Sequence, residues 1–298
     1  MDGGPLGLLD GPLIDELAAL VDSMDDDPDT RAVVLTGAHP DRFISHADIR
    51  MLAQGAGDAP SVGRTGLSVI AKVAASAGRS PRLTALAEKT PLAGAVRLNR
   101  FHQTLLQMNA SGIVYVAALN GSALGGGAEL AWACDIRIMA DDAAYFIGQP
   151  EVLLGFNPGG GGTQRLTRLV GTHRSLMAIL DGAPFTPAEA LALGVVDELS
   201  PRDDVVEQAV SWGRRFGARP REAIAAIKRS VYFGASMPLH EGLHVERTEF
   251  LYAVSSSEAL DIMKTYQRAT RDTGELPLYN PSDYADALSR GSLPAEAC

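Results

Sequence analysis

The spacing of apolar residues near the N-terminus predicts one helix followed by one strand. From Pro12 to Met24 the apolar positions recur three or four residues apart, which gives an amphipathic helix one buried face. The acidic run 25–29, which contains Pro28, should end this helix. The compact apolar run from Arg31 to Gly37 then predicts a buried strand.

The central part of the chain predicts strands that lead into glycine-rich turns. An apolar run from Ile113 to Leu119 ends at Asn120-Gly121, the pattern of a strand followed by a turn. Glycines 125–127 come next and open a helical stretch that reads AELAWA. A second buried strand is expected over 135–140, and another glycine-rich turn, 158–162, opens the helix TQRLTRLVG.

The segment 51–109 has weaker patterns. Residues 54–66 are rich in Gly, Ala, Ser and Pro and predict a loop, and 69–77 predict a short helix that RSPRLT ends. From 92 to 108 the apolar spacing is again helical. The side chains of that helix expected to face inward are Leu98, Phe101, Leu105 and Leu106.

The last third of the chain predicts a series of helices. Thr186 and Glu189 have the spacing of a capping box at the start of the helix PAEALALG. Further amphipathic helices are expected over 205–216, 221–233, 240–254 and 257–270.

Composition describes an ordinary globular protein and narrows the choice of partners. Of the 298 residues, 46% are hydrophobic and 21% charged, which is enough apolar sequence to bury a sizeable core. The net charge of −10 disfavours nonspecific binding to nucleic acid, and no apolar run is long enough to span a membrane. Only Cys134 and Cys298 occur, so we expect no disulfide framework and a reducing, cytoplasmic location.

The glycine run at 125–127 and two glutamates are the candidate chemistry. Glycines that open a helix expose backbone N–H groups, and the helix dipole adds positive potential there, so the spot favours a developing anion. Glu129 lies in the first turn of that helix, and Glu151 follows the next strand. Each feature alone also has a structural explanation, because glycine runs commonly form tight turns and an early glutamate is a favourable dipole partner.

The order of these parts resembles the crotonase (enoyl-CoA hydratase/isomerase) superfamily. The segments that carry the resemblance are NGSALGGGAEL, CDIRI, QPEVLLG and PGGGGTQRL, with HPDRFISHADIRML resembling the family's FxxGADL segment. The fold that this implies is α/β, a crotonase-like spiral of ββα turns with a C-terminal helical trimerisation layer. We expect the spiral core over 1–200 and the helical region over 201–298, with a long insertion at about 51–109.

The resemblance departs from the family's pattern at the start of the chain. It begins near GLLDGPLIDEL, so the strand hairpin that opens the family's fold has no counterpart in this sequence. We therefore expect in-frame coding sequence upstream of Met1 that restores this strand pair.

The resemblance also implies a set of site residues. Ala47 and Gly126 would supply the two N–H groups of an oxyanion hole, with Glu129 as the base and Glu151 as the acid. The residues expected to contact or shape the substrate are His46, Asp48, Gly125 and Gly159. The implied activity is hydration of a 2-enoyl-CoA to a 3-hydroxyacyl-CoA in fatty-acid type metabolism. No metal or other cofactor is expected, because CoA arrives as part of the substrate, and the implied assembly is a homotrimer or a dimer of trimers.

Three other functions stay open. A double-bond isomerase of this superfamily can work with one acid/base group, which fits Glu151 alone, although Glu129 argues against it. A non-catalytic acyl-CoA-binding protein is compatible with His46, which replaces the family's glycine, and with the absent hairpin. The net negative charge of the chain disfavours an RNA-binding function. The insertion is either a lid over the acyl pocket or a surface excursion, and the sequence favours neither.

Overall fold

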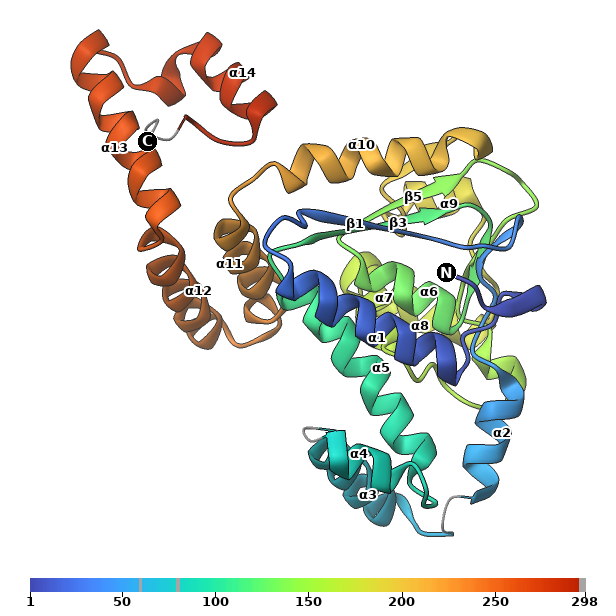
Figure 1. Ribbon diagram of the computed structural model, residues 1–298. Coiled ribbons are helices and arrows are strands. Elements are labelled where there is room, and N and C mark those ends of the chain that lie inside the picture. The colour runs from blue at the N-terminus through green and yellow to red at the C-terminus, as the bar shows by residue number, and fades with distance from the viewer. Residues whose placement is uncertain (59–60, 79–80, 295–298) are drawn as a thin grey trace.

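Two parallel sheets form the centre of the molecule (Figure 1). The computed structural model describes residues 1–58, 61–78 and 81–294. The larger sheet has the strand order β1-β3-β5-β7, and the smaller has the order β2-β4-β6. The strands are β1 (Ala32–Thr36), β2 (Arg42–Ile44), β3 (Val114–Leu119), β4 (Ser122–Leu124), β5 (Ile136–Ala140), β6 (Ile147–Gly148) and β7 (Glu198–Ser200). All residues of β3 and β5 are buried, as expected for apolar strands inside a parallel sheet.

The chain passes through these sheets as a spiral of ββα turns. Each turn contributes one strand to the large sheet, then one to the small sheet, and then a helical element. The helical elements are α2 (Ile49–Asp58) after β2, α6 (Gly126–Ala133) after β4, and the 3₁₀ helix η2 (Glu151–Leu154) with α7 (Gly162–Val170) after β6. Because β2, β4 and β6 are parallel neighbours, the segments that follow them meet at one edge. The expected spiral is therefore present.

Helices cover the large sheet on both sides (Figure 1). α10 (Val205–Gly217) lies over one face. The other face carries the fully buried α6, with α1 (Gly11–Asp26) packed beside α5 (Ala93–Ala110). A Cβ built on Gly127 of α6 would lie 2.1 Å from the carbonyl oxygen of Ile44, so only glycine allows α6 to approach β2 this closely.

The segment between β2 and β3 is more helical than its sequence predicts. α2 continues to Asp58, α3 covers Arg64–Ala77, and α4 covers Pro81–Ala87. The predicted loop at 54–66 is therefore wrong over most of the residues that the structure describes, and 59–60 lie outside them. One reason is a close backbone contact: a Cβ built on Gly55 would lie 3.5 Å from the Cα of Gly94 at the start of α5. The glycines that indicated a loop allow two helices to touch.

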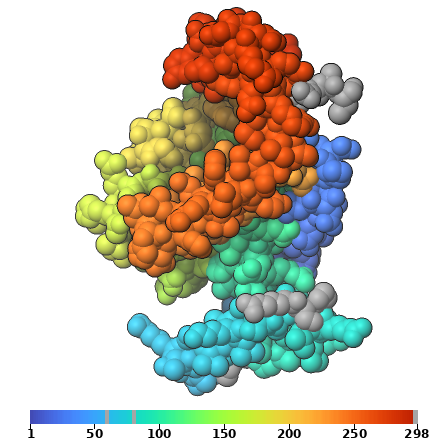
Figure 2. Space-filling view, turned by 90° about the vertical axis from the view of Figure 1, so that its left-hand side faces the viewer, coloured from blue at the N-terminus to red at the C-terminus, as the bar shows by residue number. Residues whose placement is uncertain are grey.

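The α3–α4 helices project from the main body (Figures 1 and 2). In Figure 2 they form the lower part of the molecule, below the helices that surround the sheets. On α5, Phe101 and Leu105 are buried, as predicted. Leu98 and Leu106 are 44% and 40% exposed, so their predicted inward orientation is wrong.

The C-terminal region is helical, as predicted. α8 (Thr172–Asp181), α9 (Pro187–Ala192), α11 (Arg221–Tyr232), α12 (Leu239–Val254), α13 (Ser257–Thr273) and α14 (Pro281–Arg290) are its further helices. Thr186 and Glu189 form the predicted capping box on α9. α13 and α14 extend away from the sheets (Figure 1). None of the described helices combines the length and apolar composition needed to cross a bilayer, and Cys298 lies outside the described residues.

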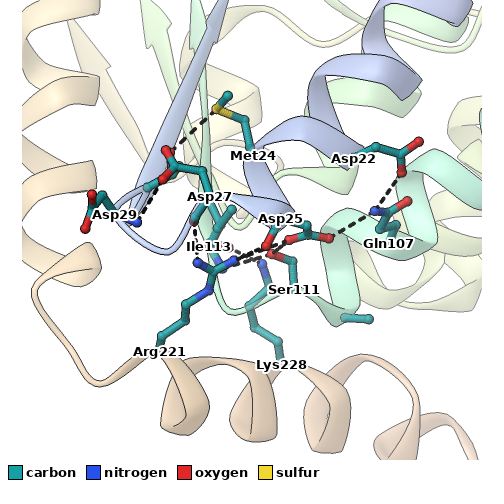
Figure 3. Close-up of polar contacts among 12 residues, drawn as sticks. Asp22, Met24, Asp25, Asp27, Asp29, Gln107, Ser111, Ile113, Arg221 and Lys228 are labelled. Atoms are coloured by element: carbon teal, nitrogen blue, oxygen red, sulfur yellow. Dashed lines mark hydrogen bonds and ion pairs between the residues drawn. The ribbon is translucent and has the colours of Figure 1, made fainter.

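α11 is attached to the core at the end of α1 (Figure 3). The Arg221 guanidinium donates to the carbonyl oxygens of Asp25 and Asp27 at 2.7 and 2.6 Å. The Lys228 ammonium donates to the carbonyl oxygen of Ile113 and to the carboxylate of Asp135, both at 2.7 Å. Lys228 is buried, so this pairing compensates for the loss of its hydration.

No strand precedes β1 in residues 1–31, all of which the structure describes. This stretch holds the 3₁₀ helix η1 (Gly4–Leu6) and α1. The Met1 ammonium donates to the carbonyl oxygen of Thr36, and the Met1 carbonyl accepts from the Ala38 N–H. The first residues thus run beside the end of β1, which is an edge strand of its sheet.

Candidate active site

Glu129 is held at the start of α6 by the loop that precedes α7. Its side chain is 3% exposed, and its Oε1 accepts hydrogen bonds from the backbone N–H groups of Gly160 and Gly162, both at 2.7 Å. A Cβ built on Gly160 would lie 2.2 Å from the other oxygen, Oε2, and 2.6 Å from a ring carbon of Phe101. Gly160 therefore has to be glycine for the loop to reach Glu129.

Two opposing effects act on the charge of Glu129. Burial raises the pKa of its carboxyl group, while the N–H groups of Gly162 and Gly160 and the nearby Arg165 guanidinium lower it. Burial is the larger effect, so the pKa lies above its ordinary value. A buried carboxylate with two N–H donors on one oxygen keeps the other oxygen available to accept a proton.

Glu151 is buried with fewer partners. It is 8% exposed and begins η2, and its Oε2 has no hydrogen-bond partner among the described residues. Burial raises the pKa of Glu151 to about 7; the N–H of the same residue lowers it, and the charge of Glu129 raises it further. A Cβ built on Gly125 would lie 3.0 Å from Glu151 Oε1, so the carboxyl group lies against the glycine run.

Ala47 and Gly126, the two residues predicted to form an oxyanion hole, lie close together in the structure. Leu9 uses the peptide groups on both sides of Ala47: its N–H donates to the His46 carbonyl, and its carbonyl accepts from the Asp48 N–H, both at 2.9 Å. In a parallel bridge of this kind the N–H of Ala47 points to the opposite side. Gly126 lies close to Ala47, because a Cβ built on Gly126 would be 3.6 Å from the Ala47 nitrogen.

The second donor follows from helix geometry. Gly126 is the first residue of α6, and the first N–H groups of a helix have no partner within it. Gly125, before it, has φ +51°, a conformation that favours glycine and that turns the chain into the helix. The resemblance predicted this pair of residues, and the structure brings them together beside Glu151.

His46 and Asp48 flank Ala47 and shape its surroundings. His46 Nδ1 lies 2.8 Å from the carbonyl oxygen of Ala47, and its Cβ lies 3.5 Å from a Cβ built on Gly125. Asp48 accepts a hydrogen bond from the Arg50 N–H at 2.8 Å at the start of α2, the hydrogen bond of a helix N-cap. The Arg50 side chain and N–H lower the pKa of the Asp48 carboxyl group.

A cleft of about 510 Å³ opens beside these residues. His46, Asp48 and Leu124 lie on its wall, so it reaches the segments that carry Ala47 and Gly125. Two cationic side chains, Arg42 and Arg50, also line it. The remaining lining residues are Leu6, Leu8, Asp41, Ser45, Ile49 and Ser122.

Several residues of the site were not found by sequence reasoning. The N–H donors to Glu129 belong to Gly160 and Gly162, whereas Gly159 is exposed and offers its carbonyl oxygen to His102. Gln149 is buried and donates to the Gly125 carbonyl at 3.2 Å. The four glycines 159–162 and the sequence QPE stand out in the sequence. Which glycine N–H groups donate to Glu129, however, is decided only by how the loop folds.

The described residues contain no group of three or more His, Cys, Asp or Glu side chains placed to hold a metal ion. The expectation that catalysis needs no metal or other cofactor stays a prediction.

Known proteins resemble this chain in sequence and in structure. The family model described as enoyl-CoA hydratase/isomerase matches residues 76–269. The fatty acid oxidation complex subunit alpha of Shewanella putrefaciens is 33% identical over 228 residues, which are 76% of this chain and 27% of that protein. The chain thus spans about a quarter of the length of the curated relatives it matches.

Two solved structures extend the likeness over most of the fold. The enoyl-CoA hydratase structure from Geobacillus kaustophilus HTA426 has a TM-score of 0.69 at 29% identity, covering 88% of this chain and 86% of that one. The enoyl-CoA hydratase from Bacillus anthracis has a TM-score of 0.66 at 25% identity, covering 87% and 86%. With the ββα spiral, the buried glutamates and the family model matched over more than half its length, this chain belongs to the enoyl-CoA hydratase/isomerase (crotonase) family.

Proposed function

We propose that this protein is an enoyl-CoA hydratase, which adds water across the double bond of a 2-enoyl-CoA. The observation that carries this proposal is the pair of buried glutamates with different surroundings beside the N–H groups of Ala47 and Gly126. Hydration needs a base and an acid at one site, and environments that differ are what separate those roles.

The oxyanion hole polarises the substrate. The thioester oxygen accepts hydrogen bonds from the Ala47 and Gly126 N–H groups, and negative charge moves onto it as water attacks C3. Donors fixed by β-bridging and by a helix start need little reorganisation during the reaction, and one such donor is typically worth about 2.7–4 kcal/mol.

Glu129 is the proposed base. Oε1 accepts from two N–H groups, which aim the carboxylate and favour its ionised form against the larger effect of burial, and Oε2 takes a proton from water as the water oxygen bonds to C3. Glu151 is the proposed acid. With a pKa of about 7 it carries a proton for much of the time at neutral pH, and it delivers that proton to C2 of the enolate. Transfer of the proton from Glu129 back to Glu151 through solvent resets the site.

The cleft beside the hole suits the CoA part of the substrate. Arg42 supplies positive charge for phosphate groups, Arg50 is in an ion pair with Asp48 on the same wall, and Leu124 and Ile49 supply apolar surface. By analogy with the relative from Shewanella putrefaciens, we place the reaction in fatty-acid type metabolism. The scarcity of cysteine favours a reducing compartment, the cytoplasm.

A double-bond isomerase is the second candidate. Glu151 has an unpartnered buried oxygen, and one acid/base group of this kind can move a proton between two carbons of the substrate. Glu129, however, is positioned by two N–H groups, and an isomerase that uses Glu151 alone leaves that arrangement without a role.

The test is an assay of the purified protein with crotonyl-CoA and longer 2-enoyl-CoAs, following loss of the conjugated absorbance. We expect Glu129→Gln and Glu151→Gln each to lower kcat by about 100-fold or more while CoA-ester binding is kept. Glu246→Gln, an exposed change on α12, is the matched control. Near-normal hydration by Glu129→Gln would favour the isomerase, and binding without turnover in the wild type would favour an acyl-CoA-binding protein.

We also propose that the protein assembles as a trimer or a dimer of trimers. The C-terminal helices carry large apolar side chains on their exposed surface, more than solvent-facing helices usually show. They include Ile227 and Val231 on α11 and Leu239, Phe250, Leu251 and Tyr252 on α12.

A further inference from the structure

α5 places a histidine on the loop that holds Glu129. His102 is half-buried, and its Nε2 lies 2.7 Å from the carbonyl oxygen of Gly159. A carbonyl oxygen only accepts, so Nε2 carries the proton and donates it. The preceding residue, Phe101, is buried against the same loop, with a ring carbon 2.6 Å from where a Cβ on Gly160 would lie.

The bond from His102 reaches Glu129 through one peptide group. The carbonyl of Gly159 and the N–H of Gly160 belong to the same planar amide. That N–H donates to Glu129 Oε1 at 2.7 Å. Hydrogen bonds in such a chain polarise one another, so a donor on the Gly159 oxygen strengthens the bond that the Gly160 N–H makes to the carboxylate.

Other charged groups around Glu129 act from different elements. Arg165 on α7 donates to the Gly160 carbonyl at 3.3 Å and lowers the pKa of Glu129, and Glu151 on η2 interacts with it as a like charge. Neither of them bonds to the Gly159–Gly160 peptide. Among the described residues, His102 bonds to this peptide, and it does so from α5, the last helix of the insertion.

We propose that His102 is a positioning residue for the base: by donating to the Gly159 carbonyl it fixes the Gly160 N–H on Glu129 and favours the ionised carboxylate. The proposal rests on the proposed function in assigning Glu129 as the base. It gives α5 a part in the reaction, although no atom of His102 needs to touch the substrate.

The test compares three variants of the full-length protein. His102→Leu removes the donor, and His102→Gln keeps an amide N–H near the position of Nε2. Gln103→Leu changes the exposed neighbour on the same helix and is the control. The first measurement is the pH dependence of kcat/KM with crotonyl-CoA, whose acidic limb reports ionisation of the base in the free enzyme. The second is the amide NMR signal of Gly160 across the same pH range, which follows ionisation of Glu129 without turnover.

We expect His102→Leu to move both midpoints upward by about half a pH unit or more and to lower kcat about 5- to 30-fold. KM should change less than about twofold, because no substrate contact is lost. His102→Gln should restore most of the wild-type behaviour, and Gln103→Leu should match the wild type. Should His102→Leu lose its native circular dichroism, His102→Asn, too short to reach the Gly159 oxygen, replaces it.

Two outcomes separate this proposal from the hydratase assignment. If the Gly160 signal titrates with the same midpoint in His102→Leu and in the wild type, the positioning role is wrong, whatever the activity. If that midpoint moves but the wild type hydrates no enoyl-CoA, the positioning of Glu129 holds and the hydratase assignment fails.

Discussion

At the scale of single residues, the site is built by backbone groups that only glycine allows to come close. Gly160 and Gly162 donate to Glu129, Gly125 turns the chain beside Glu151, and Gly126 offers its N–H at the start of α6. The two carboxyl groups are both buried, yet one is held by two donors and the other has a free oxygen. The acid and base roles proposed for the two glutamates rest on this difference in surroundings.

The unusual proton affinity of Glu151 predicts a pH-dependent stability. Its pKa is about 7 in the folded protein against an ordinary value of 4.5, so the folded state binds the proton more tightly than the unfolded state does. The resulting stabilisation is complete below about pH 4.5 and is lost as the pH rises to about 7. Glu151→Gln is neutral at every pH and escapes this loss.

We therefore expect Glu151→Gln to be more stable than the wild type at pH 8 by on the order of 1–2 kcal/mol, with the difference shrinking towards pH 5. Urea unfolding at the two pH values measures this, with Glu246→Gln as the control. A difference that is equal at pH 5 and pH 8 would show that the substitution acts through packing instead.

The close contact between Gly160 and Glu129 predicts that alanine lowers kcat much more at position 160 than at position 159. Gly160→Ala places a methyl group 2.2 Å from Glu129 Oε2 and 2.6 Å from Phe101, so the loop or the carboxylate has to move. We expect kcat to fall by about 10- to 100-fold, because a misplaced base loses much of its effect. At Gly159 an added Cβ meets nothing within 4 Å.

Gly159→Ala is accordingly the matched variant, and we expect its kcat to stay within about threefold of the wild-type value. If Gly159 contacts the substrate, this variant should change KM instead. Steady-state kinetics of the two variants with crotonyl-CoA decides the matter. Equal losses of kcat would mean that the loop acts on the substrate rather than on Glu129.

At the scale of elements, the helical insertion connects the segment at Ala47 to the loop that holds Glu129. α2 starts directly after Ala47 and Asp48. α5, the last helix of the insertion, places Phe101 and His102 against the loop at Gly160. Phe101 thus supports the site, and replacing it would disturb Glu129 rather than report on a lid. α3 and α4 lie farther out and carry exposed apolar residues, including Leu67, Val73 and Leu83.

The contact between α2 and α5 makes the outer helices removable. Because Gly55 and Gly94 touch, a four-residue Gly/Ser linker can replace residues 58–91 without moving either helix. If α3 and α4 form a lid, their loss should change the kcat/KM ratio of short to long enoyl-CoAs by about 10- to 100-fold, the effect of losing one apolar contact of 1.5–3 kcal/mol. Thermal unfolding is measured alongside, and a flat chain-length profile with a lowered Tm would make the insertion a scaffold.

The order of motifs that resembles the crotonase family predicted the spiral, which the structure has, and pointed to Glu129 and Glu151, which the structure buries beside Gly160 and Gly125. The prediction of secondary structure is wrong where a glycine can either form a loop or allow two helices to pack closely. Gly55 indicated a loop but lies in α2, since glycine also permits close packing of helices, here against Gly94 of α5. His102 was not singled out, because its partner lies 57 positions away and meets it only once α5 has packed on the core.

At the scale of the whole molecule, the exposed face of the C-terminal helices predicts the assembly. Figure 2 shows α12 running across the side of the body, with α13 and α14 above it. We expect light scattering after size exclusion to give three or six times the chain mass of 31.4 kDa. Phe250→Asp with Leu251→Asp should lower this to a single chain, because buried carboxylates oppose association.

Glu246→Gln on the same helix should keep the assembly intact and controls for changes to α12 itself. An unchanged mass for the double aspartate variant would exclude this face as the interface, and a single-chain mass for the wild type would contradict the trimer.

The hydrogen bonds that join α11 to the end of α1 also bear on how a nascent chain acquires its fold. Arg221 bonds to the backbone of Asp25, and these residues lie 196 positions apart in the chain. At about 5–20 residues per second, the ribosome makes Asp25 on the order of 10–40 s before Arg221. During the later part of that interval the apolar strands β3 and β5 exist without α10, the helix that covers one face of their sheet. We therefore expect the unfinished chain to depend on chaperones until α10 and α11 emerge, and chains stopped before residue 221 to aggregate rather than wait as a folded core.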